Sequence, residues 1–114
     1  MYSFKELGPA ELRALLQTPE AKRIRLFDVR SPAEAQRGAI PGAENVPLHV
    51  LPLREGEWRS TEDEGDDTLR IFYCQSGGRS AQACALLSAR GHRNVCNLRG
   101  GIMGWIESGG AVSL

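Results

Sequence analysis

Metal-binding motifs and disulfide frameworks have little support in this sequence. It contains three cysteines and two histidines, and none of them stands in a C-x-x-C pair or at another spacing typical of zinc ligands. We therefore expect no metal site. An odd number of cysteines in a reducing compartment favours free thiols over disulfides. Because Cys84 and Cys96 lie in apolar segments, we expect both to be small buried side chains.

An excess of charge of one sign and long apolar runs are also missing. The 14 basic and 14 acidic residues balance, so there is no electrostatic case for nucleic acid or an anionic membrane as a partner. Residues 1–5 lack the basic-then-apolar pattern of a signal peptide, and the apolar runs are too short to span a membrane. No G-x-G-x-x-G or G-K-[ST] motif supports nucleotide binding. These absences favour a cytoplasmic protein with a small partner. The length of 114 residues fits one domain, over residues 1–114.

Strand-like and helix-like segments alternate along the chain. Alternating or β-branched segments predict strands at 3–7, 23–29, 44–47, 69–73 and 94–98. Apolar periodicity and capping signals predict helices at 9–16, 31–37, 80–90 and 102–107. Residues 48–53 are expected to be irregular or helical, and the acidic segment 54–67 a solvated loop. The alternation indicates an α/β fold, with a mostly parallel five-stranded sheet at its centre and helices on both faces.

One cysteine, Cys74, stands between a predicted strand and the longest predicted helix. Gly77 and Gly78 follow it and can take positive φ, so the loop can turn several backbone N–H groups toward the Cys74 sulfur. A helix that begins near Arg79 or Ser80 adds the positive end of its dipole, and thiols at such positions have a lowered pKa. Ligands of parallel sheets bind beyond the carboxyl ends of strands, where this loop lies. The pattern therefore predicts a cysteine nucleophile, in preference to a structural cysteine, which an apolar site would suit better.

Three separated motifs together resemble the rhodanese homology family. They are residues 26–30 followed by residues 38–48, the pattern Cys74-x-x-Gly77-x-Arg79-Ser80, and residues 95–98 followed by Gly100-Gly101 and Trp105. The motifs span nearly the whole chain in the family's order. One departure is visible: Ala39 stands where the family usually has histidine before the Ile-Pro-Gly-Ala turn. We expect this change to affect local packing more than activity.

The resemblance implies a sulfurtransferase with a rhodanese-like fold. Cys74 would take sulfane sulfur from a donor such as thiosulfate, carry it as a persulfide, and pass it to cyanide, a thiol or a protein. No cofactor is required. The backbone of residues 75–80 would cradle the sulfur, so the expected substrate-binding residues are Gln75, Ser76, Gly77, Gly78, Arg79 and Ser80.

Several side chains near Cys74 have two possible roles. Arg79 can bind an anionic donor through its fork of N–H groups, or form an ion pair with a carboxylate. Ser80 can hydrogen-bond the donor or cap the helix. Asp28 and Arg30, at the end of another strand, are expected to rigidify the loop rather than to act directly.

Two other classes of function remain as alternatives. A cysteine-dependent phosphatase or arsenate reductase also uses a cradle of amides, but four residues separate Cys74 from Arg79 where the phosphatase signature has five. The shorter loop leaves less room for a tetrahedral phosphate. A non-catalytic rhodanese module that binds or regulates a partner is the second alternative, and the retained Cys74 argues against it. Fold-level resemblance does not identify the physiological donor or acceptor.

Overall fold

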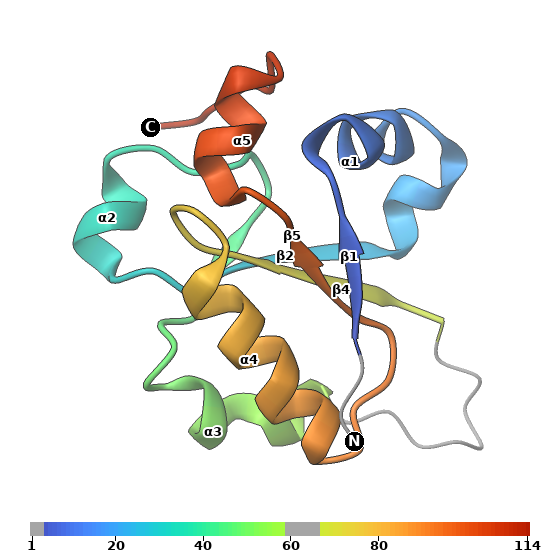
Figure 1. Ribbon diagram of the computed structural model, residues 1–114, viewed down its shortest axis with the longest axis vertical. Coiled ribbons are helices and arrows are strands. Elements are labelled where there is room, and N and C mark those ends of the chain that lie inside the picture. The colour runs from blue at the N-terminus through green and yellow to red at the C-terminus, as the bar shows by residue number, and fades with distance from the viewer. Residues whose placement is uncertain (1–3, 59–66) are drawn as a thin grey trace.

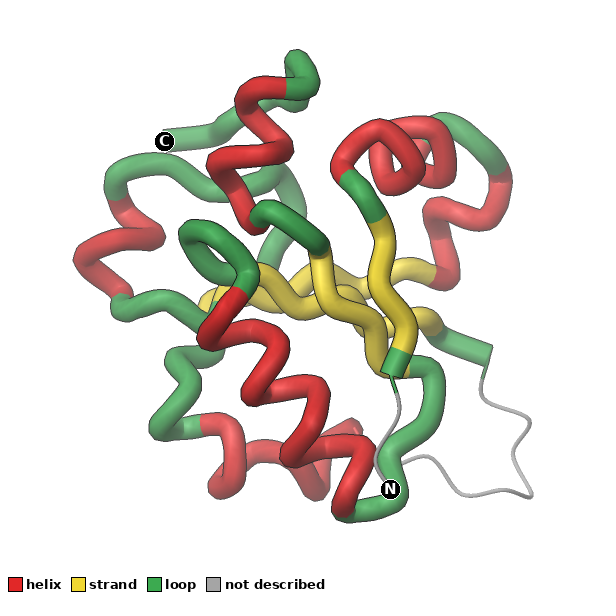
Figure 2. The backbone as a smooth tube through the Cα atoms, in the orientation of Figure 1, coloured by secondary structure: helices red, strands yellow, loops and turns green. Residues whose placement is uncertain are grey.

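The central feature is a five-stranded sheet, seen in a computed structural model that describes residues 4–58 and 67–114 (Figures 1 and 2). The spatial order of the strands is β1-β5-β4-β2-β3, and every neighbouring pair is parallel. Their bounds are β1 (Lys5–Leu7), β2 (Ile24–Asp28), β3 (Glu44–Asn45), β4 (Leu69–Tyr73) and β5 (Val95–Leu98). The predicted α/β fold is thus confirmed, with β4 at the centre of the sheet.

Helices cover both faces of the sheet. They are α1 (Pro9–Leu16), α2 (Pro32–Gln36), α3 (Leu51–Arg54), α4 (Gly78–Ala89) and α5 (Gly101–Glu107), with 3-10 helices η1 (Pro19–Arg23) and η2 (Glu55–Trp58). Figure 1 shows α1 and α5 on one face and α3 and α4 on the other. Of the helices in the described ranges, none is long and apolar enough to cross a membrane.

Alternate residues of each inner strand supply two separate cores. On β2 and β4, Phe27 and Phe72 face α3 and α4, and their rings stack with centroids 4.9 Å apart. Their neighbours Leu26 and Ile71 face α1 and α5 on the other side. Because successive side chains of a strand point to opposite faces, a strand between two helical layers must be apolar almost throughout. The run of residues 69–73 has this composition.

The segment 54–67 differs from the solvated loop expected of it. Residues 54–58 are helical, and Glu55 and Trp58 are buried. Trp58 is 2% exposed and packs its ring 4.9 Å from that of Phe27, and the gain from burying so large a side chain outweighs the polar character of the segment. Arg90 donates to the Glu55 carboxylate at 3.0 Å. The prediction is wrong for 54–58, and residues 59–66 lie outside the described ranges.

The start of one helix also differs from the prediction. Helix α4 begins at Gly78, earlier than the predicted start at Arg79 or Ser80, because Gly77 takes φ +112° and turns the chain directly into the helix. In α5, Trp105 is buried in the core, whereas Met103 is 47% exposed and lies at the surface.

The turn before α5 packs directly against the backbone that follows β4. The amide of Ile102 donates to the Cys74 carbonyl at 2.9 Å, and that of Met103 to the Gln75 carbonyl at 3.2 Å. Gly101 lies between these contacts with φ +61°, and a Cβ built there would come 2.5 Å from the Cys74 carbonyl oxygen. Glycine is required at this position by both its conformation and its surroundings.

We expect Gly101→Ala to lower the free energy of unfolding by about 2–5 kcal/mol, the sum of a left-handed backbone penalty and overpacking. Gly42→Ala is a matched control, since Gly42 has φ +86° but no atom within 4 Å of the added Cβ. It should lose only the backbone part, about 1–2 kcal/mol. Denaturant titration of both variants measures the difference, and equal losses would show that the contact with the Cys74 loop has no energetic weight.

Candidate active site

The loop from Cys74 to Gly77 follows the central strand at the carboxyl end of the sheet. On one side of it lies the end of β2, where the Val29 amide donates to the Tyr73 carbonyl at 2.9 Å. On the other side lies the turn between β5 and α5, which binds the loop carbonyls. The loop is therefore fixed by both neighbouring strands before any side chain is considered.

The Cys74 sulfur lies inside the curl of this loop. The Gly77 amide donates to Sγ at 3.1 Å, and the Ser80 hydroxyl oxygen lies 3.5 Å from it. Burial by itself raises the pKa of the thiol, but hydrogen bonds from the Ser80 hydroxyl and from the backbone amides of Ser80, Gly77 and Ser76 outweigh it. The pKa of Cys74 consequently lies below its ordinary value. Such a thiol is more fully ionised near neutral pH than a free cysteine.

Ser80 is fully buried, and its hydroxyl has a partner that the sequence pattern did not indicate. The hydroxyl lies 2.5 Å from Oδ1 of Asn97, a residue of β5 that is 2% exposed. The amide nitrogen of Asn97 in turn donates to the Gly77 carbonyl at 3.4 Å. Asn97 therefore contacts two residues of the loop from the neighbouring strand.

The Arg79 side chain forms an ion pair with Glu34 of α2. Its two terminal nitrogens donate to the two carboxylate oxygens of Glu34 at 2.7 and 2.9 Å. This bidentate pairing, with help from Ser31, holds the pKa of Glu34 at about 2. Glu34 also completes a capping box at the start of α2 by accepting from the Ser31 amide. Of the two roles considered for Arg79, the ion pair is the one present in the structure.

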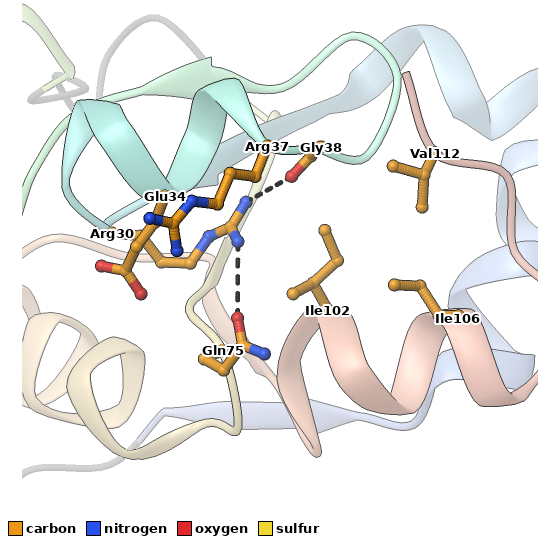
Figure 3. A pocket seen from close by; sticks show the side chains of 8 residues that line it. All are labelled: Arg30, Glu34, Arg37, Gly38, Gln75, Ile102, Ile106 and Val112. Carbon is orange, nitrogen blue, oxygen red and sulfur yellow. Dashed lines mark hydrogen bonds between the residues drawn. The ribbon is translucent and has the colours of Figure 1, made fainter. Parts of the chain in front are cut away.

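Asp28 and Arg30 form a buried ion pair at the end of β2. The Arg30 Nη2 donates to Asp28 Oδ2 and to the Gly38 carbonyl, both at 2.7 Å. The pair reaches the loop through one contact, 3.5 Å from Arg30 Nη1 to Gln75 Oε1 (Figure 3). Its main contacts join β2 to the segment after α2, where Ala39 forms a backbone bridge with Ser113.

A cavity of about 350 Å³ opens beside the loop at Gln75 (Figure 3). One side of it is polar, with side chains of Arg30, Glu34 and Arg37. The other side is apolar, with Ile102, Ile106 and Val112. The cavity is large enough for a small molecule and borders the residue next to Cys74.

The other two cysteines are placed differently from Cys74. Cys84 and Cys96 are buried, as the sequence predicts, and burial raises the pKa of both thiols, that of Cys96 to about 11. Neither thiol is ionised at neutral pH. Within the described parts of the chain, no three His, Cys, Asp or Glu side chains gather into a possible metal site.

Known proteins with similar sequences and structures share this fold. A sulfurtransferase from Allochromatium vinosum is 41% identical over 90 residues, which are 79% of this chain and 78% of that protein. The human thiosulfate:glutathione sulfurtransferase is 35% identical over 105 residues, 85% of this chain and 89% of that protein. A rhodanese-related protein from Thermoplasma volcanium has a solved structure that superposes with a TM-score of 0.81 at 30% identity, covering 97% of this chain and 99% of its own.

The family comparison agrees with the motifs described above. The model of the Rhodanese-like domain matches residues 8–108. With nearly the whole length matched, and with relatives of similar size named as sulfurtransferases, the chain belongs to the rhodanese-like domain family.

Proposed function

We propose that this protein is a sulfurtransferase that carries sulfane sulfur on Cys74 as a persulfide. The observation that carries the proposal is the position of the Cys74 sulfur, enclosed by N–H and O–H donors that lower its pKa. Support also comes from relatives, because proteins 41% and 35% identical to this chain are named sulfurtransferases. General sulfurtransferase activity is what the family membership supports, and the donor, the acceptor and the persulfide are our proposal.

The reaction takes place in two displacements. In the first, the Cys74 thiolate attacks the outer sulfur of thiosulfate, the S–S bond of the donor breaks, and sulfite leaves with the bonding electron pair. In the second, a thiolate or cyanide attacks the outer sulfur of the persulfide, and Cys74 leaves as a thiolate. Covalent catalysis of this kind gives ping-pong kinetics. The cradle is made of amides of Ser76, Gly77 and Ser80, so it acts on the sulfur in both steps.

Donor and acceptor are assigned by analogy with a relative. The human protein is named for thiosulfate and glutathione, so we propose thiosulfate as a donor and a small thiol as an acceptor here. The cavity beside Gln75 has the size for such a molecule. A cytoplasmic location, predicted from the sequence, remains a prediction.

The geometry of the site favours neither alternative function. The phosphatase signature has five residues between the cysteine and the arginine, whereas four separate Cys74 from Arg79 here. In addition, the Arg79 side chain is paired with Glu34. A purely regulatory module has no use for a cysteine whose pKa is lowered by several donors. Sulfur transfer accounts for both features.

Incubation with thiosulfate should add one sulfur atom to the intact protein, because the Cys74 thiolate retains the sulfane sulfur. Intact-mass measurement before and after cyanide treatment tests this, with cyanide expected to remove the added mass. Cys74→Ser is the control and should gain nothing, since Cys84 and Cys96 stay protonated. No adduct in the unmutated protein with any of several sulfane donors would exclude the proposal, and rapid hydrolysis of an aryl phosphate would favour the phosphatase.

The rate of Cys74 alkylation by iodoacetamide should rise with pH to a plateau. The midpoint of this rise should lie below that of an unfolded cysteine, which is about 8.5. The sign follows from the lowered pKa in the folded state: thiolate is present at a lower pH than in the unfolded chain. Cys74 is only 1% exposed, so the position of the midpoint is compared, and not the absolute rate. A midpoint at or above that of the protein in denaturant would contradict the role of the cradle.

Glu34→Gln and Arg79→Gln should each lower kcat/KM for thiosulfate about twofold to fivefold, since a partly exposed ion pair contributes about 0.5–1 kcal/mol. Both side chains form one ion pair between α2 and α4, so the double variant should be no worse than either single one. Steady-state kinetics of the four proteins measure this. A far larger loss for Arg79→Gln, confined to KM, would instead show that Arg79 binds the donor anion.

A further inference from the structure

Asn97 is a buried polar side chain in the middle of a strand that otherwise contributes apolar residues to the two cores. It is 2% exposed on β5, next to the central strand. A buried amide without partners is costly, so each of its polar atoms needs a hydrogen bond. All of them have one. The partners come from β1, from the Cys74 loop and from α4.

The neighbours of Asn97 decide which end of its amide is which. Nδ2 lies 3.0 Å from a carboxylate oxygen of Glu6 and 3.4 Å from the Gly77 carbonyl, and both of these groups accept only. Nδ2 therefore donates to both, and Oδ1 faces Ser80. Because Oδ1 is an acceptor, the Ser80 hydroxyl must donate across the 2.5 Å that separate them.

The Ser80 hydroxyl has one proton and three possible acceptors. Asn97 Oδ1 lies at 2.5 Å, the Gly77 carbonyl at 3.3 Å and the Cys74 sulfur at 3.5 Å. While Cys74 is a neutral thiol, the shortest bond keeps the proton on the side of Asn97, and the thiol S–H can donate to a free lone pair of Ser80. When Cys74 becomes a thiolate, the proton is drawn toward the sulfur, and Asn97 Oδ1 loses its donor.

We propose that Asn97 is a positioning residue for sulfur transfer, which competes with the Cys74 sulfur for the single proton of the Ser80 hydroxyl. The Asn97 amide holds the Ser80 oxygen beside the sulfur. For the Ser80 hydroxyl to donate to the sulfur, it must give up its buried hydrogen bond to Asn97. Asn97 thus limits how far the cradle stabilises the thiolate. The proposal rests on the proposed function of Cys74, but it concerns the ionisation of the Cys74 thiol and not the sulfane sulfur that Cys74 carries.

The charged groups around the loop do not depend on Asn97 for their own partners, apart from Glu6. Arg79 on α4 is paired with Glu34 on α2, and Asp28 is paired with Arg30 at the end of β2. Glu6 on β1 is exposed and can be hydrated when the Asn97 amide is removed. A change in the ionisation of Cys74 after substitution of Asn97 therefore reports the hydroxyl of Ser80 and not a rearranged ion pair.

A double-mutant cycle with the pH dependence of Cys74 alkylation tests the proposal. Asn97→Val removes the amide and suits a strand, so Ser80 is free to donate to the sulfur, and the alkylation midpoint should fall by about one pH unit. Ser80→Ala removes the donor, so the midpoint should rise. In the Ser80→Ala background, Asn97→Val should cause no further shift. An unchanged or raised midpoint in Asn97→Val, or a shift that persists without the Ser80 hydroxyl, would overturn the proposal.

A second measurement keeps the test independent of how well the variants fold. Asn97→Ala removes the same amide with less bulk and should reproduce the fall if Asn97→Val is unstable. In the unmutated protein at a pH where Cys74 is protonated, the Raman S–H band that disappears on alkylation should lie at the lowered frequency of a thiol that donates to Ser80. In Ser80→Ala it should lie at a higher frequency, and equal frequencies would refute the assignment.

Failure of this proposal can be distinguished from failure of the proposed function. Alkylation and the S–H band are measured without any sulfur donor, so they do not depend on persulfide formation. A protein that gains sulfur from thiosulfate but shows no coupling between Asn97 and Ser80 would retain its function and lose this inference. A protein that shows the coupling between Asn97 and Ser80 but gains no sulfur would retain this inference and lose the proposed function.

Discussion

The geometry of the site depends on the contact between the loop carbonyls after β4 and the first amides of α5. Ile102 and Met103 donate to the carbonyls of Cys74 and Gln75. A peptide unit is planar, with its C=O and N–H on opposite sides, so a carbonyl held toward α5 turns the next N–H the other way. For the peptide after Gln75 this turns the Ser76 amide toward the sulfur, where it contributes to the lowered pKa of Cys74. Gly101 permits the approach because it has no Cβ to obstruct it.

The charges near the loop are arranged so that neutral donors, and not a free cation, act on the sulfur. Arg79 is neutralised by Glu34 and Arg30 by Asp28. Both arginines instead join segments: Arg79 joins α4 to α2, and Arg30 joins β2 to the chain after α2. Fixed amides need no reorganisation when charge develops on the sulfur, which is the condition for effective electrostatic stabilisation. The ion pairs therefore hold the segments around the loop together, and the backbone amides act on the sulfur.

The parts of the fold that local pattern determines were predictable from the sequence, and those made by distant contacts were not. The apolar run 69–73, Cys74 and Gly77 predict a strand, a loop and a helix, and the structure has all three. Asn97 gave no signal, because an asparagine in a short strand is usually a solvent-facing residue, and its partner Glu6 is 91 positions away. Trp58 was hidden among acidic neighbours, since composition averaged over 54–67 conceals one large side chain that packs on Phe27. The Arg79 ion pair was one of two roles considered for this side chain, and its partner Glu34, 45 positions away, could not be identified from the sequence alone.

A lowered but not extreme pKa suits a cysteine that must act twice. In sulfur transfer as proposed, Cys74 attacks as a thiolate and later leaves as a thiolate when the acceptor takes the outer sulfur. A lower pKa makes it a better leaving group but a weaker nucleophile, and the best attacking thiol has a pKa near the ambient pH. Amides of the loop lower the pKa of Cys74, because they stabilise the thiolate. Asn97 acts against this lowering, because it draws the Ser80 proton away from the sulfur. Opposed contacts on one hydroxyl give the fold a means to set the pKa of Cys74 between the two demands.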